Sequence, residues 1–269
     1  MNATIKMFRA SLKSIIRDRQ SVVGALMFPL IFLLAFSAFD INLTGDGIGT
    51  DGGGIDYIDF VLPGILSMAA LQFSVFWTSG SYARMGETGV LRRLQATPIS
   101  MSSFLAGQVL ARLLVVAAQA SIVIGVGVLL GATVTGNFAW LILLAMIASA
   151  VFLSLGFAIG AKASGVDSAG MMSGMAVMPL VFLSGAWFPI GTLPGWLQSV
   201  VEWLPLAPLM DAMRAVVLES ASLADVASDL ALVAAWVPAT FLIAVAAMRP
   251  KKSTRAGSVG KLKAREATA

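Results

Sequence analysis

The candidate functional residues are in segment 84–103, RMGETGVLRRLQATPISMSS, which is the one cluster of positive charge between the chain's two ends. We expect this segment to bind a partner surface. An apolar stripe flanked by arginines, on a helix too short to be stable alone in water, needs a partner surface, either protein or lipid headgroups. A solvated loop whose arginines only follow the inside-positive bias of membrane proteins is the simpler alternative.

The same segment predicts a short surface helix. Thr88 can cap it, Pro98 stops it, and Val90, Leu91 and Leu94 fall three to four residues apart on one face. The polar positions then point elsewhere: Arg92, Arg93 and Gln95.

Composition excludes most catalytic chemistry. The chain has no cysteine and no histidine, which removes disulfides, thiolate or imidazole metal ligands and His-dependent triads, so no catalytic, metal or cofactor site is predicted. Ser258 and Lys261 have S-x-x-K spacing, but they lie in a polar tail where chance explains the match better. The basic residues stand beside apolar runs, as membrane topology requires, so nucleic acid is not an expected partner.

The sequence on both sides of the basic segment predicts membrane-spanning helices. With 58% hydrophobic residues, 12% charged residues and a mean hydropathy of +0.89, the chain cannot cover a soluble globule. We expect an all-α integral membrane protein with one transmembrane domain over residues 1–248 and a basic, unstructured tail over 249–269. Apolar runs long enough for a hydrocarbon core of about 30 Å predict six spans, at about residues 21–39, 58–82, 104–130, 138–161, 168–187 and 230–248.

Residues 1–20 predict an amphipathic helix on the inner headgroups, because apolar and basic residues occupy separate faces. Cleavage of the first span as a signal peptide, near Ala35-Phe36-Ser37, is the competing interpretation.

Charge sets the expected topology. Every lysine and arginine except Arg214 falls in a segment drawn inside, and every acid except Asp18, Glu87, Asp167 and Glu266 falls outside. Six spans with both termini cytoplasmic follow. Removing the first span would leave the other five oriented identically. The glycine-rich, acidic residues 40–59 form an outside loop whose spacing fits no EF-hand.

The segment between the fifth and sixth spans is broken by prolines and carries tryptophans suited to the boundary of hydrocarbon and water. Two short helices, at about residues 194–204 and 208–220, are expected to dip into the outer leaflet as re-entrant pieces. Asp211 and Arg214 could pair on one helix face. Small residues spaced by four, such as Gly156 and Gly160, permit close helix packing, within one subunit by default and between subunits as an alternative.

Two stretches together resemble the permease subunits of type 2 ABC transporters, especially the bacterial drug and lipid export branch. In the first, an acidic residue and a glycine precede a hydrophobic and basic helix with an Ala-Thr-Pro stop: Glu87, Thr88, Gly89, Leu91, Arg92, Arg93, Leu94, Ala96, Thr97 and Pro98. In the second, outer segment, the matching positions are Leu183-Ser184-Gly185, Phe188-Pro189, Leu193-Pro194, Leu204-Pro205 and Arg214.

The resemblance implies a half-transporter that works with a separate ATP-binding cassette subunit and a second permease copy, identical or related. The first stretch would be a coupling helix between spans two and three that docks on the ATPase. An outer gate would be shaped by Phe182, Gly185, Phe188, Pro189, Pro194 and Pro205. ATP and magnesium would bind to the partner, because no GxxxxGK[ST] loop occurs in this chain.

The function this implies is export of a hydrophobic or amphipathic molecule, drug-like or lipid-like, by alternating access. Spans without acids or histidines in their middles argue against a proton-coupled pump. Export of a polysaccharide or lipid-linked glycan is the alternative within the family. An intramembrane enzyme and a structural membrane protein are the alternatives of other classes.

Overall fold

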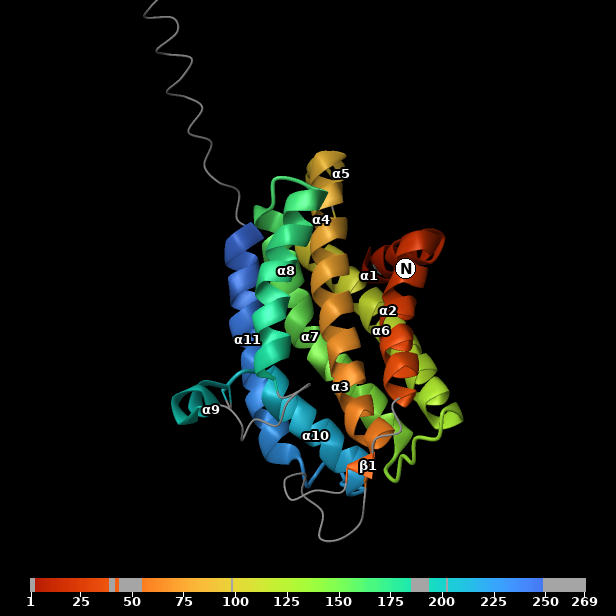
Figure 1. The fold of residues 1–269 in the computed structure, drawn as a ribbon. Helices are drawn as coiled ribbons and strands as arrows, with labels where there is room; N and C mark the ends of the chain where they lie inside the picture. The colour runs from red at the N-terminus through yellow and green to blue at the C-terminus, as the bar shows by residue number, and fades with distance from the viewer. Residues whose placement is uncertain are drawn as a thin grey trace, which may run out of the picture.

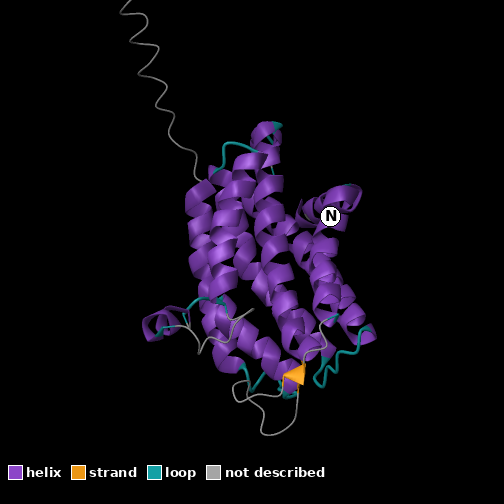
Figure 2. Ribbon diagram, in the orientation of Figure 1, coloured by secondary structure: helices purple, strands orange, loops and turns teal. Residues whose placement is uncertain are grey.

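The computed structural model describes residues 3–38, 42–43, 55–97, 99–184, 194–201 and 203–248, and almost all of this part is helical (Figure 2). The first half contains α1 (Ala3–Arg17), α2 (Arg19–Ser37), β1 (Asn42–Leu43), β2 (Ile55–Asp56), α3 (Tyr57–Gln72), a π-helical turn η1 (Phe73–Trp77), α4 (Thr78–Glu87), α5 (Val90–Gln95) and α6 (Met101–Leu129). The second half contains α7 (Phe138–Lys162), α8 (Val166–Leu183), α9 (Gly195–Val201), α10 (Leu206–Leu218) and α11 (Ala227–Met248).

Four helical stretches are long and apolar enough to cross a membrane: Ile58–Glu87, Ser103–Leu129, Phe138–Lys162 and Val166–Leu183. A fifth is added if α1 and α2, bent by 65°, count as one broken span. The apolar stretch of α11, Ala227–Ile243, falls in the shorter class of 10–17 residues. Length and composition therefore support four or five of the six predicted spans. The predicted tail, residues 249–269, lies outside the described residues.

The second predicted span, residues 58–82, is longer than expected. α3, η1 and α4 form one continuous helical stretch that runs through the first arginine of the basic segment and ends at Glu87. Ser81 and Arg84, polar residues near its end, line a cavity. α7 approaches its π-helical turn closely: a Cβ added to Gly156 would lie 2.6 Å from the Ser74 carbonyl oxygen.

Helix α7 packs against α11, α4, α6 and η1 at the centre of the bundle (Figure 1). Ser149 of α7 shares a hydrogen bond of 2.5 Å with Ser74, and a Cβ on Gly160 would lie 2.6 Å from the Ser79 carbonyl oxygen. The predicted Gly156 and Gly160 pair is therefore used inside one subunit, which the sequence left open. Gly170, by contrast, has no neighbouring atom within 4 Å of an added Cβ.

The end of the bundle that carries β1, α9 and α10 lies opposite α5 (Figure 1). β1 and β2 pair antiparallel, with Asn42 opposite Asp56 and Leu43 opposite Ile55. Buried Asp59 accepts hydrogen bonds from Thr133, 2.7 Å from the backbone nitrogen and a second from the hydroxyl. These bonds fasten the loop between α6 and α7 to the start of α3.

Helix α10 is enclosed by protein. It packs against α3, α11 and α7, and most of its side chains are buried: Leu206, Ala207, Pro208, Leu209, Met210, Ala212, Met213, Val216 and Val217. The predicted pair forms, with Arg214 Nη1 3.9 Å from Asp211 Oδ1, and the Arg214 guanidinium also lies 4.5 Å above the Phe60 ring. α9 is different, because Trp196 and nearby Trp203 are 72% and 69% exposed.

Candidate coupling segment and inner cavity

The basic segment begins with a sharp turn at Gly89, the residue that caps α5. Gly89 has a φ of +70°, in the left-handed region that glycine adopts without strain. The prediction that Thr88 caps α5 is wrong. The Thr88 hydroxyl donates to the Arg84 carbonyl at 2.8 Å and closes the end of α4 instead, which leaves the cap position to glycine.

Helix α5 has an inner and an outer face. Leu91 and Leu94 pack against a cluster built around Tyr82, Phe104 and Phe157, so these two residues of the predicted stripe find their partner within this chain. The prediction that Val90 shares their face is wrong, because Val90 is exposed. The outer face exposes Val90, Arg92, Arg93, Ala96 and Thr97. The Arg93 Nη2 donates to the Thr88 carbonyl at 2.9 Å, which ties the helix to its own turn. A docking partner would therefore meet the arginines and Val90, not the leucines.

Glu87 joins the basic segment to α8. Its Oε1 accepts a hydrogen bond of 3.2 Å from the backbone nitrogen of Val166, the first residue of α8. A carboxylate at a helix N-terminus is favoured by the unpaired N–H groups and the helix dipole. Gly165 makes this approach possible, because a Cβ there would collide with the same Oε1. A movement of α5 would thus reach both α4 and α8.

Helix α1 is fixed to α6 by close backbone packing. A Cβ on Gly107 would lie 2.7 Å from the Met7 Cβ and 2.8 Å from the Phe8 nitrogen, and the Ser11 hydroxyl donates to Gln108 Oε1 at 2.8 Å. Ile5 and Ile16 remain exposed on the other side of α1. The predicted apolar face is therefore divided between a protein contact and a free surface.

Arg112 connects α6 to α4. An arginine within the predicted span 104–130 must either extend its charge to the membrane surface or face a protein interior, and Arg112 is 1% exposed. Its guanidinium donates to the Thr78 hydroxyl at 3.0 Å, to the Ser81 hydroxyl at 2.6 Å and to both oxygens of Gln108 that can accept, the backbone one at 3.2 Å.

The guanidinium also lies 5.3 Å from the centroid of the Phe157 ring on α7. Among the described residues no carboxylate lies within 4.0 Å of it, so its contacts are hydroxyl groups, amide groups and the Phe157 ring. Ser11, Gln108 and Arg112 form one polar chain from α1 through α6 to α4. These contacts come from segments far apart in the sequence.

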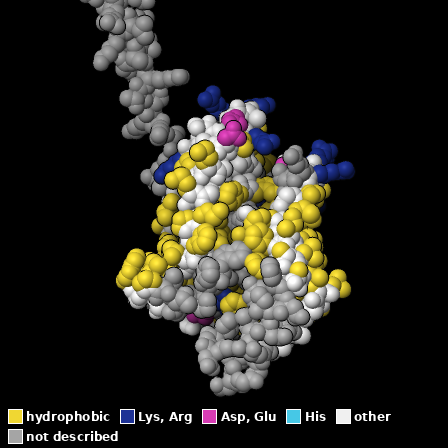
Figure 3. All heavy atoms as spheres, viewed as in Figure 1, with side chains coloured by type: hydrophobic (Ala, Val, Ile, Leu, Met, Phe, Trp, Pro, Cys, Tyr) yellow, Lys and Arg dark blue, Asp and Glu magenta, His cyan; other side chains and the backbone are white. Residues whose placement is uncertain are grey.

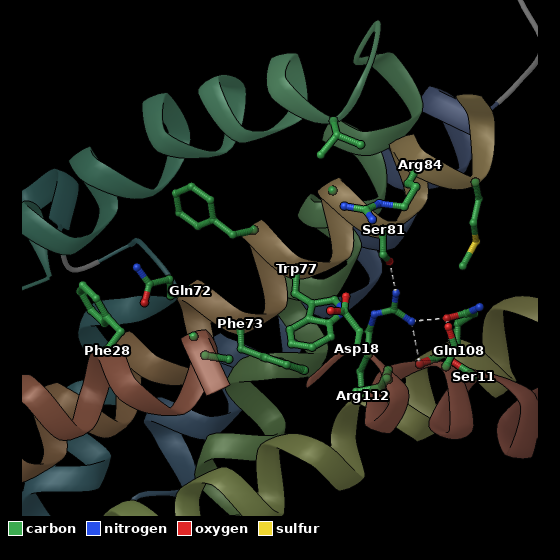
Figure 4. Close-up of a pocket in the computed structure, with 18 of the residues that line it drawn as sticks. Ser11, Asp18, Phe28, Gln72, Phe73, Trp77, Ser81, Arg84, Gln108 and Arg112 are labelled. Carbon is green, nitrogen blue, oxygen red and sulfur yellow. Dashed lines mark hydrogen bonds between the residues drawn. The ribbon is translucent and has the colours of Figure 1, made fainter. Parts of the chain in front are cut away.

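A cavity of about 620 Å³ opens beside these hydrogen-bonded residues (Figure 4). One wall is formed by α1 and α2, and the other by η1 and α4. Phe28 and Phe73 lie toward one end, together with Gln72, and Trp77 lies in the middle of the view beside Asp18. Toward the other end lie the polar and charged residues Ser11, Ser81, Arg84, Gln108 and Arg112. Sequence reasoning did not predict this cavity. The available signal was the three- to four-residue spacing, typical of one helix face, of the lining residues Phe73, Trp77, Ser81 and Arg84.

The predicted outer-gate residues are only partly described. Phe182 is 58% exposed at the end of α8, Pro194 is exposed before α9, and Pro205 is buried before α10. Gly185, Phe188 and Pro189 lie outside the described residues, as does Pro98 of the coupling segment. Within the described ranges, no group of three or more acidic residues could hold a metal ion.

Comparison with known proteins supplies the family. Residues 2–218 match the family described as ABC-2 type transporter. Nodulation protein J of Rhizobium leguminosarum bv. viciae is 27% identical over 238 residues, covering 85% of this chain and 86% of that protein.

Two further relatives carry transport names. The daunorubicin resistance ABC transporter permease protein DrrB1 of Streptomyces coeruleorubidus is 28% identical over 81% of this chain and 77% of its own length. The probable multidrug ABC transporter permease YbhR of Escherichia coli K12 is 28% identical over 63% of this chain and 46% of its own length.

Proposed function

The chain belongs to the ABC-2 type transporter family, that of ABC transporter permease subunits, and on that premise we propose that it is the membrane half of an ATP-driven exporter. It moves a hydrophobic or amphipathic molecule, drug-like or lipid-like, by alternating access. The observation that carries the proposal is the family match together with α5, a helix whose apolar face is held by the chain's own core and whose basic face is free.

In the proposed topology six helices cross the membrane, with α2 as the first and α11 as the sixth. The ends of α1 and α11 that lead to the termini lie at the same end of the bundle as α5 (Figure 1), as an even number of spans requires. On the face drawn in Figure 3 most lysines and arginines also gather at that end, above a broad apolar band. The inside-positive bias makes this end cytoplasmic. α1 lies on the inner headgroups, with Ile5 and Ile16 toward lipid.

The ATP-binding cassette subunit docks on the exposed face of α5. Arg92 and Arg93 stand at the tip of the bundle, where an acidic partner surface can approach them, and Val90 adds a small apolar contact. ATP and magnesium bind on that subunit, since the sequence of this chain has no phosphate-binding GxxxxGK[ST] loop. A second permease copy, identical or related, completes the transporter.

Force from the ATPase travels along covalent and packed connections. Leu91 and Leu94 make α5 part of the inner-end core, the turn at Gly89 joins it to α4, and Glu87 links it to α8. Rotation of α5 therefore tilts α4 and α8 together, which supplies the two arrangements that alternating access needs. At the far end of α8, Phe182 and the segment with Pro194 and Pro205 act as the outer gate.

The aromatic lining of the cavity favours a hydrophobic or amphipathic cargo over a polysaccharide, which would require a larger polar surface. The Ser258 and Lys261 pair, the basis of the enzyme alternative, lies outside the described residues.

Copurification tests the proposal. The tagged chain, purified from its native membrane, should retain an ATP-binding cassette subunit identified by mass spectrometry. Arg92→Glu should reduce that yield severalfold, whereas Arg9→Glu, an exposed basic residue on α1, should leave it unchanged. Absence of any ATP-binding subunit from the wild-type preparation would refute the proposed function.

A further inference from the structure

The inner cavity has the length and polarity of one membrane leaflet. The wall formed by η1 and α4 follows one face of the continuous helix from Phe73 to Arg84, a distance of eleven residues. At about 1.5 Å per residue this is about 16 Å, close to half of a hydrocarbon core of about 30 Å. A molecule that reached from end to end would place its body against aromatic rings and its head among polar groups (Figure 4).

The polar end carries an excess of positive charge. Arg84 and Arg112 line it, with Asp18 as the one acid among the lining residues. Hydroxyl and amide donors stand beside them, from Ser11, Ser14, Ser81, Thr88 and Gln108. Such a set suits a phosphate or carboxylate better than an ammonium group.

The surroundings would concentrate anionic amphiphiles at this opening. The exposed side of α1 carries Lys6, Arg9, Lys13 and Arg17. Basic residues near a membrane surface attract anionic lipid by about 1 kcal/mol each, which corresponds to roughly fivefold in local enrichment. Next along the chain, α2 exposes Val23, Met27 and Ile31, so its outer side suits contact with lipid chains.

We propose that this cavity binds an amphiphile with an anionic headgroup, taken from the leaflet at the α1 end, with its head at the exposed Arg84 and its apolar body against Phe28, Phe73 and Trp77. Buried Arg112 adds positive charge behind that site. The site gives the proposed exporter a ligand class and an entry point. It rests on the proposed function only in identifying the bound amphiphile as cargo, because binding itself needs no ATPase.

Two glycines allow the cavity to be filled without disturbing its walls. Gly80 on α4 and Gly24 on α2 both line it, and an added Cβ at either would meet no atom within 4 Å. Gly125 on α6 is the matched control, because it also has no neighbour within 4 Å but does not line the cavity. Leucine at each position adds the same volume, so only its location differs.

Trp77 provides the probe. The purified chain, without any ATPase, is reconstituted in phosphatidylcholine vesicles containing increasing fractions of dibrominated phosphatidylglycerol or of dibrominated phosphatidylcholine. Bromine quenches a tryptophan that it touches, and subtracting the signal of Trp77→Phe isolates the share that belongs to Trp77. We expect half-maximal quenching of Trp77 at a severalfold lower fraction of phosphatidylglycerol than of phosphatidylcholine.

The variants decide what causes that preference. Gly80→Leu should abolish it, with Gly24→Leu as a second filling from the opposite wall, and Gly125→Leu should keep it. Arg84→Gln should reduce it by roughly fivefold, while Arg84→Lys retains most of it. Inorganic phosphate at 10 mM should not compete, because it lacks the apolar body.

Three results would overturn the proposal. Equal quenching by both lipids would remove the charge selectivity, and a preference for a brominated cationic lipid would reverse it. No quenching of Trp77 by any lipid would show a cavity closed to amphiphiles, as it would be if a second copy covered it. Copurification of the ATPase could still succeed in each case, so loss of this site and loss of the proposed transport function are separable.

Discussion

Gly156 offers the most direct test of how the inner helices are held together. A Cβ there would lie 2.6 Å from the Ser74 carbonyl oxygen and 2.9 Å from the Thr78 Cβ, against an ordinary contact distance of 3.4 Å or more. Gly156→Val therefore requires α7 to move away from η1 by about 0.8 Å, the difference between 3.4 and 2.6 Å. Overpacking of this kind costs about 1–3 kcal/mol.

The shift would also stretch the hydrogen bond between the Ser74 and Ser149 hydroxyls, which are 2.5 Å apart. Loss of a hydrogen bond in a membrane bundle costs a further amount of about 0.6 kcal/mol. At roughly 2–4 °C per kcal/mol, the melting temperature should fall by roughly 3–15 °C. Thermal unfolding of the purified chain in detergent, followed by tryptophan fluorescence, measures it.

The control is Gly125→Val, where the added side chain meets no atom within 4 Å. Valine forms helix slightly better than glycine, so this variant should melt at the wild-type temperature or a little above. Equal losses at both positions would mean that valine disturbs the helices for a reason unrelated to the α7 contact. An unchanged melting temperature for Gly156→Val would refute the close packing itself.

Three further predictions concern the connections of the coupling segment. Gly165→Ala should displace the Glu87 carboxylate and lower the amount of substrate transported per ATP hydrolysed in the assembled transporter. Glu87→Gln keeps a hydrogen-bond acceptor and should lower this ratio less. Equal losses for the two variants would contradict the steric explanation. Gly89→Ala should cost about 1 kcal/mol because it forces an L side chain to a φ of +70°, and an unchanged melting temperature would argue against the left-handed turn. Arg112→Lys should weaken the packing of α1 although it keeps the charge, because an ammonium has three donors where this guanidinium makes four hydrogen bonds. The rate of proteolysis within α1 should therefore rise. An unchanged rate would show that α1 does not depend on the polar chain of Ser11, Gln108 and Arg112.

The membrane helices were predictable because long apolar runs in the sequence mark where they begin and end. Residues 104–130 and 138–161 were expected as spans, and α6 and α7 occupy Met101–Leu129 and Phe138–Lys162, because each helix follows a long apolar run. Length and composition support four spans, or five with the bent pair, so the count of six stays a prediction.

The inner site was harder to predict because it is made by contacts between distant segments. The sequence placed Leu91 and Leu94 on one face, but not that Tyr82, Phe104 and Phe157 would cover that face. Thr88 is a good helix cap by residue type, yet the tight turn requires a positive φ that only Gly89 adopts cheaply.

The outer end shows the same limit. The prolines predicted two short helices after the fifth span, at about residues 194–204 and 208–220, and the structure has α9 (Gly195–Val201) and α10 (Leu206–Leu218) in that segment. They gave no sign that Met210 and Met213 would be fully buried, because that depends on α3 and α7 coming together around α10.

Site-specific labelling tests the central claim, that α5 lies on the cytoplasmic side and receives an ATPase. Because the chain has no cysteine, Val90→Cys and Ala224→Cys each introduce a single thiol, on exposed residues at opposite ends of the bundle. In intact cells a membrane-impermeant maleimide should label Cys at 224 and spare Cys at 90, and in inverted vesicles the pattern should reverse. The thiol at 90 should also become protected when the ATP-binding subunit is bound. Labelling of position 90 from outside intact cells would contradict the account.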